Sequence, residues 1–130
     1  MSANRYAVMP DLTRPIIGAA IAVHRELGPG LLEGTYQACF LRQLSADGLV
    51  ARQEVPIQIR YKGIAVDEVA YRADVIVDGK VLVELKAVET LLPVHEAQVL
   101  SYLKHSGLRV GLLINFNVEQ LIKGVRRFVR

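Results

Sequence analysis

The chain has 130 residues, the length of one ordinary domain, and carries a formal net charge of +3. Hydrophobic residues make up 52% of it and charged residues 22%, a balance that excludes a disordered chain and predicts a packed core. The single cysteine, Cys39, excludes an intrachain disulfide, and we expect it to be a packed, inert thiol. Residues 15–23 form the longest apolar stretch, far short of the roughly 20 residues that span a bilayer. We therefore expect a soluble, cytoplasmic protein without a membrane partner.

The first predicted elements are two helices. Thr13 is a good N-cap for a helix whose apolar residues recur at helical spacing as far as Leu27. Gly28-Pro29-Gly30 then interrupts the chain. A second helix is expected over residues 31–46, ended by Asp47-Gly48.

Short strands follow. Residues 51–55 and 57–61 are separated by Pro56, which indicates a bend or a sheet edge. Residues 64–68 and 71–77 are further strand-like runs. A hairpin turn at Asp78-Gly79 joins the second of them to a strand over residues 81–86.

A third helix is predicted from Pro93 to Gly107, where the glycine suits the position after a helix end. Residues 109–116 are apolar on both faces, as in a strand buried on both sides. Residues 121–130 alternate apolar and basic side chains and form either a last strand or a short helix. This order predicts one mixed α/β (α+β) domain over residues 1–130, with a central mixed sheet and an antiparallel meander flanked by helices.

The register of the hairpin decides where its carboxylates point, because side chains alternate between the two faces of a strand. A two-residue loop would place Asp74 and Glu84 on opposite faces. A three-residue loop containing Gly79 places both on one face, together with Lys86. Burying a large apolar side chain contributes ~1.5–3 kcal/mol, so the apolar pattern favours the odd loop. The other face then holds Ala73, Val75, Val77, Val81, Val83 and Leu85.

Two neighbouring carboxylates repel each other unless a cation lies between them, and oxygen ligands select Mg²⁺ or Mn²⁺. Such a metal polarises phosphoryl oxygens, and the ammonium of Lys86 can stabilise the charge that develops there. Asp74, Glu84 and Lys86 therefore indicate a metal-dependent phosphodiesterase site. The alternative is an ordinary exposed strand face carrying a Glu–Lys pair.

Residues 30–36, Gly-Leu-Leu-Glu-Gly-Thr-Tyr, have the pattern G-x-x-E-x-x-Y. Together with Val83-Glu84-Leu85-Lys86, His95-Glu96-Ala97-Gln98 and the apolar run at 111–116, they make the chain resemble the GxxExxY protein family, a branch of the PD-(D/E)XK nuclease superfamily. The resemblance covers about residues 12–128. It implies a restriction-endonuclease-like core.

The resemblance also carries Asp74, Glu84 and Lys86 onto the superfamily's catalytic positions. It matches Glu33 to a helical acid near the metal and Gln98 to a polar residue that faces the site. Ala73 replaces the superfamily's proline, which holds no metal. Without the resemblance, Glu33 in the first turn of its helix would be read as a helix-dipole residue.

Other side chains are candidates for contacts with the substrate. Tyr102 lies one helical turn after Gln98, and His95 one turn before it, so the three could orient water or phosphate or form an ordinary polar face. Near the end of the chain, the basic residues form either a phosphate-contacting patch or a solvated edge; they are Lys123, Arg126, Arg127 and Arg130.

These features predict a Mg²⁺- (or Mn²⁺-) dependent nuclease acting on DNA or RNA. The alternative is a catalytically inactive module of the same fold that binds nucleic acid or a protein partner. Because 130 residues leave little chain beyond a minimal core, a homodimer or a partner protein would be a natural source of further substrate contacts.

Overall fold

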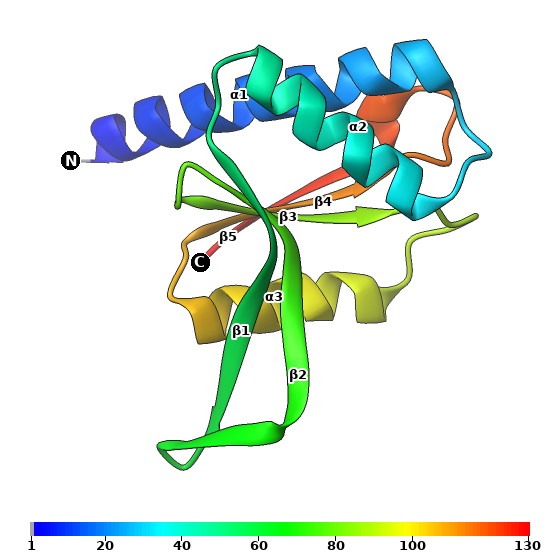
Figure 1. Cartoon of the computed structure of the whole chain (residues 1–130). Coiled ribbons are helices and arrows are strands. Elements are labelled where there is room, and N and C mark those ends of the chain that lie inside the picture. The colour runs from blue at the N-terminus through cyan, green and yellow to red at the C-terminus, as the bar shows by residue number, and fades with distance from the viewer. Residues whose placement is uncertain (1) are drawn as a thin grey trace.

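The computed structural model describes the backbone of residues 2–130 and the side chains of residues 12–130. A five-stranded sheet lies between two layers of helices (Figure 1). One face is covered by α1 (Ser2–Leu27) and α2 (Glu33–Ala46), and the other by α3 (Pro93–Ser106). In spatial order the strands are β1 (Ala51–Tyr61), β2 (Ile64–Val77), β3 (Val81–Lys86), β4 (Val110–Asn115) and β5 (Val125–Val129), the last preceded by the 3₁₀ helix η1 (Leu121–Gly124).

The sheet is mixed. β1, β2 and β3 form an antiparallel meander, β3 and β4 are parallel, and β5 pairs antiparallel with β4. Parallel strands need a crossover connection, which α3 provides. This arrangement confirms the predicted restriction-endonuclease-like fold, a mixed sheet with an antiparallel meander flanked by helices.

The turn between β2 and β3 has the predicted odd length. Val77 pairs with Val81, so Asp78-Gly79-Lys80 forms a three-residue loop, and Gly79 supplies a φ of 66°. The apolar face created by this register packs against α1 and α2, where five of its six predicted members are fully buried. They are Val75, Val77, Val81, Val83 and Leu85.

Ala73 does not belong to that face, contrary to the prediction. It is buried against the α3 side of the sheet with Val55 and Ile57. Between Gln53 and Val55 the facing strand β1 contains Glu54, whose φ of 50° lies in the left-handed region and breaks the alternation of side chains. The β1–β2 ribbon therefore changes face at this point and continues as a two-stranded arm past α3 (Figure 1).

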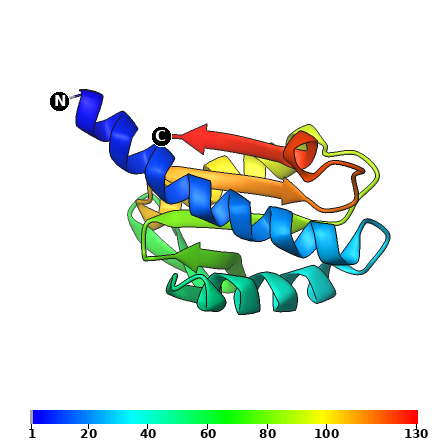
Figure 2. The same ribbon diagram turned by 90° about the horizontal axis from the view of Figure 1, so that it is seen from above.

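Several element boundaries also differ from the prediction. α1 begins at Ser2, so Thr13 lies inside the helix and is not its N-cap. In Figure 2 the N-terminal part of α1 extends beyond the sheet. β1 and β2 are each continuous, although two runs were predicted for each. Pro56 does not interrupt β1, because β1 is an edge strand and its outer side needs no hydrogen bond from this residue. Both interpretations of residues 121–130 are correct, since η1 is followed by β5.

None of the helices that the structure describes is long and apolar enough to cross a membrane.

Candidate active site

Two carboxylates lie where β2 and β3 stop pairing through their backbones. The regular ladder ends at the pair Val75–Val83. Beyond it, the backbone N–H of Asp74 donates to Oε2 of Glu84 at 2.7 Å, and the N–H of Leu85 donates to Oδ2 of Asp74 at 2.8 Å. Each carboxylate thus binds the opposite strand through one oxygen and retains a second oxygen. The predicted convergence of Asp74 and Glu84 is the geometry that the strands adopt.

Both carboxyl groups are difficult to ionise in this position. Glu84 is only 3% exposed, and burial, followed by the charge of Asp74, raises its pKa from 4.5 to about 8. Burial also raises the pKa of Asp74 from 3.8 to about 6, against the opposing hydrogen bond from Leu85. Burial of Glu84 rules out the alternative of an exposed strand face. A bound cation would offset both pKa shifts.

Lys86 and Glu33 lie within electrostatic range of the pair. The half-buried Lys86 ends β3, and its ammonium acts to lower the pKa of both Asp74 and Glu84. Glu33 begins α2, and its charge raises both pKa values. The role that the resemblance implies for Glu33 remains a prediction.

The loop before Glu33 is fixed by Tyr36, one turn later in α2. Its hydroxyl donates to the carbonyl of Gly28 at 2.5 Å and accepts from the N–H of Leu31 at 3.2 Å. Its buried ring stacks on Phe116 with a centroid separation of 4.6 Å. The tyrosine of the G-x-x-E-x-x-Y pattern thus holds the start of α2, and with it Glu33, against the end of β4.

From the other side, α3 presents Gln98 and Tyr102. The amide Nε2 of Gln98 donates to the Tyr102 hydroxyl at 3.1 Å. Burial raises the pKa of Tyr102, and the nearby charges of Glu84 and Asp74 raise it further. Tyr102 is therefore within electrostatic range of the carboxylates, and Gln98 is hydrogen-bonded to it. His95 has a different role, since its Nδ1 accepts from the N–H of Leu92 and caps α3.

Two further polar residues, Glu54 and Gln37, lie beside Asp74, and the sequence analysis did not indicate them. Nε2 of Gln37, on α2, donates to Oε2 of Glu54 at 2.8 Å and to the carbonyl of Asp74 at 3.5 Å. The charge of Glu54 adds to the upward pKa shift of Asp74. The register of β1 against β2 would have placed Glu54 beside Asp74, but a predicted break at Pro56 left that register undefined.

The basic residues near the end of the chain are not part of this cluster. β4 lies between β5 and the strands that carry the carboxylates. Arg126 pairs with Leu113 and Arg127 with Leu112, so their side chains point to opposite faces of β5. With Lys123 and Arg130 they are exposed, but they do not form one patch beside the site.

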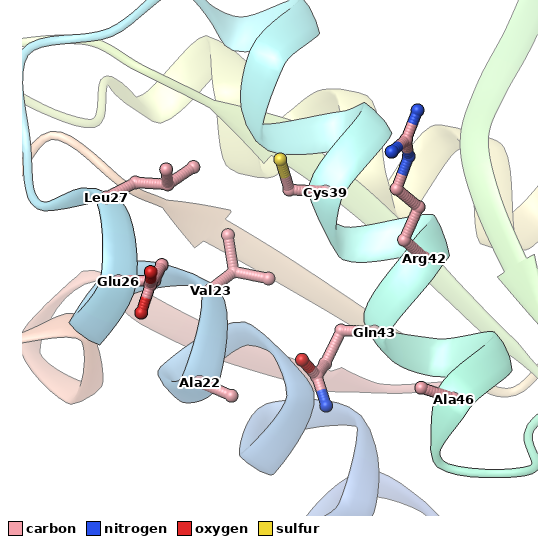
Figure 3. A pocket seen from close by; sticks show the side chains of 8 residues that line it. All are labelled: Ala22, Val23, Glu26, Leu27, Cys39, Arg42, Gln43 and Ala46. Carbon is pink, nitrogen blue, oxygen red and sulfur yellow. The ribbon is translucent and has the colours of Figure 1, made fainter.

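A hollow of about 580 Å³ opens between α1 and α2 (Figure 3). Its walls are mostly apolar, with Glu26 and Arg42 at the sides. Cys39, expected to be packed, lines this hollow and is partly exposed. The residues that line this hollow include one carboxylate, Glu26, and no pair of carboxylates such as Asp74 and Glu84.

A family model described as the PD-(D/E)XK nuclease superfamily matches residues 10–128. The chain belongs to the PD-(D/E)XK nuclease superfamily. Searches of the curated proteins and of the solved structures each found no match. Membership of this superfamily indicates a nuclease, and its members usually use divalent metals.

The carboxylates of this nuclease domain fit one kind of metal site. Within residues 12–130, no three His, Cys, Asp or Glu side chains are grouped closely enough to enclose an ion. Asp74 and Glu84 instead offer a metal ion the two carboxylate oxygens, one from each residue, that the opposite strand does not bind. Mg²⁺ is usually held by one or two carboxylates, with waters and substrate phosphates completing its shell. The donor set therefore fits Mg²⁺ or Mn²⁺ held partly by substrate.

We expect Glu84→Gln to stabilise the metal-free protein at alkaline pH. The folded protein binds the Glu84 proton more tightly than the unfolded chain does, so the wild type loses stability as pH rises from about 4.5 to about 8. Glutamine stays neutral and can still accept from the Asp74 N–H. The variant should gain on the order of 2 kcal/mol in unfolding free energy at about pH 9 and nothing at about pH 4.

Urea unfolding in chelator across this pH range measures the effect. With Mg²⁺ added, the order should reverse, because the metal stabilises only the protein that binds it. A variant less stable than the wild type at every pH would contradict the shift assigned to Glu84.

Proposed function

We propose that this protein is a Mg²⁺- or Mn²⁺-dependent nuclease that hydrolyses phosphodiester bonds in DNA or RNA. The main support is the crossed pair of hydrogen bonds that fixes Asp74 and Glu84 at the divergence of β2 and β3. We also propose that it belongs to the GxxExxY branch of the superfamily, since Gly30, Glu33 and Tyr36 build the loop and helix start that reach these carboxylates.

Asp74 and Glu84 would hold the metal through the oxygens not used by the opposite strand. When bound, the metal would polarise a phosphoryl oxygen and lower the pKa of a coordinated water. The backbone donors at Asp74 and Leu85 keep both carboxylates in place before any cation arrives. Little reorganisation is then needed on binding.

The remaining residues act on the substrate. Lys86 would stabilise negative charge as it develops on the phosphoryl group. Glu33 and Gln98 would orient the attacking water from α2 and α3, and the Tyr102 hydroxyl would donate to a phosphate oxygen. Along the far edge of the sheet, contacts to more distant phosphates would come from Lys123, Arg126 and Arg127.

The test combines a metal titration with a panel of nucleic acids. Isothermal calorimetry with Mg²⁺ and Mn²⁺ should show binding to the wild type and none to Asp74→Ala. Cleavage of DNA and RNA, single-stranded and duplex, should follow the same division. Glu68→Ala, which removes an exposed acid from β2 outside the cluster, should behave as the wild type. Equal cleavage by Asp74→Ala and the wild type would reveal a contaminating nuclease and refute the proposal.

A further inference from the structure

Beyond the carboxylates, the arm formed by β1 and β2 contains a second hollow. The pairing of the two strands shifts register between Ile57 and Ile59, and a cavity of about 260 Å³ opens there. Its walls are largely apolar and include Pro56 and Val69. Tyr71, Asp67 and Arg72 add an aromatic ring, an acid and a base to the lining.

One ring contact links the lining of this hollow to the candidate active site. The ring of Tyr71 meets the ring of Tyr102 edge-on, with centroids 6.3 Å apart and planes at 69°. Tyr102 in turn is bound by Gln98 and lies in the field of Glu84 and Asp74. The rings of Tyr71 and Tyr102 therefore lie between the hollow on the arm and the carboxylates.

We propose that this hollow binds an unpaired base of the substrate strand, so that the nuclease acts on single-stranded nucleic acid. The inference rests on the proposed function and names its substrate class. Tyr71 is 39% exposed and offers ring surface for stacking, and Val69, 54% exposed, offers apolar surface beside it. A base inside a duplex is already stacked and paired and would have to be flipped out at an energetic cost.

The acid of the hollow, Asp67, favours a base over a phosphate as the bound group. Asp67 would repel a phosphate but can accept a hydrogen bond from an exocyclic amino group. A strand with its base stacked on Tyr71 would lead past Tyr102 to the carboxylates, which places its backbone at the reacting position.

The test measures binding of a short single-stranded oligonucleotide that carries a fluorescent base analogue quenched by stacking. A duplex of the same sequence is the comparison, and the Lys86→Ala protein in Mg²⁺ is used so that cleavage does not interfere. Adding Tyr71→Ala should weaken single-strand binding roughly 5- to 150-fold and remove the quenching. Tyr71→Phe, which keeps the ring, should retain both, and duplex binding should not change.

Tyr61→Ala is the matched control, because Tyr61 is 67% exposed on the same arm, beside Lys62 and outside the hollow. It should bind as the parent does. If loss of the Tyr102 contact unfolds Tyr71→Ala, Val69→Asp tests the same hollow at an exposed position of its lining. It should reduce single-strand affinity at least about 5-fold. Unchanged single-strand affinity in these variants, or an equal loss on the duplex, would overturn the proposal.

The two proposals fail in different ways. If the wild-type protein cleaves nothing but shows Tyr71-dependent quenching, the proposed nuclease activity is refuted and the proposed base-binding hollow is retained. If the protein cleaves single strands and duplexes equally and Tyr71→Ala is fully active, the proposed nuclease activity is retained and the proposed base-binding hollow is refuted.

Discussion

Lys86→Ala is expected to reduce Mg²⁺-dependent cleavage by at least about 10²-fold, while the protein still binds the metal. The ammonium lies close enough to oppose the upward pKa shifts of Asp74 and Glu84, so it also lies near whatever phosphate these carboxylates engage. A lysine donates no ligand to Mg²⁺, because the metal takes oxygen donors. Removing it deletes charge stabilisation and leaves the metal site.

The comparison with Asp74→Ala separates metal binding from charge stabilisation by Lys86. Asp74→Ala should lose both metal binding and cleavage, whereas Lys86→Ala should lose cleavage alone. Metal affinity of Lys86→Ala should rise slightly, since a nearby positive charge has been removed. Calorimetry and initial cleavage rates on the same preparations provide both readouts.

Lys80→Ala is the matched control, because Lys80 is an exposed lysine in the turn of the same hairpin. Its cleavage rate should equal that of the wild type. Full activity in purified Lys86→Ala would remove Lys86 from the mechanism and favour an inactive module of the nuclease fold.

The hairpin was predictable from sequence because one energetic term dominates it. Five apolar side chains share a face only if the loop between Val77 and Val81 has an odd length, and their burial outweighs any turn preference. Glu84 and Asp74 then follow by alternation. The double-sided apolar strand β4 and the glycine that ends α3, with its φ of 78°, were predictable for similarly local reasons.

The arm and Glu54 were not predictable in this way. Alternation assumes extended backbone, and the positive φ at Glu54 breaks it at a residue type that gives no warning. The change of face moves Ala73 to the α3 side and brings Gln37 of α2 against Glu54. These are tertiary contacts between segments far apart in the chain, so a single sequence read by local pattern does not contain them.

The second large effect is expected at Tyr36. Tyr36→Ala should cost about 3–5 kcal/mol of unfolding free energy, because the ring is fully buried and stacked on Phe116. Tyr36→Phe keeps the ring and removes only the hydroxyl that bridges Gly28 and Leu31. Its stability cost should be about 1–3 kcal/mol, since two hydrogen bonds are lost and each contributes about 0.5–1.5 kcal/mol.

The informative result is the effect of Tyr36→Phe on the loop rather than on stability. Without the hydroxyl, the carbonyl of Gly28 and the N–H of Leu31 lose this partner, so the loop over residues 28–32 and the start of α2 should loosen. Glu33 would then be less well placed toward Asp74 and Glu84. Hydrogen exchange at residues 28–32 should accelerate in Tyr36→Phe, and the cleavage rate should fall more than the stability loss explains.

Glu33→Gln provides the comparison for this step. If Tyr36 acts by positioning Glu33, a protein that already carries Glu33→Gln should lose little further activity when Tyr36→Phe is added. Independent, additive losses in the double variant would show instead that the tyrosine supports the fold near Phe116 without directing the acid toward the carboxylates.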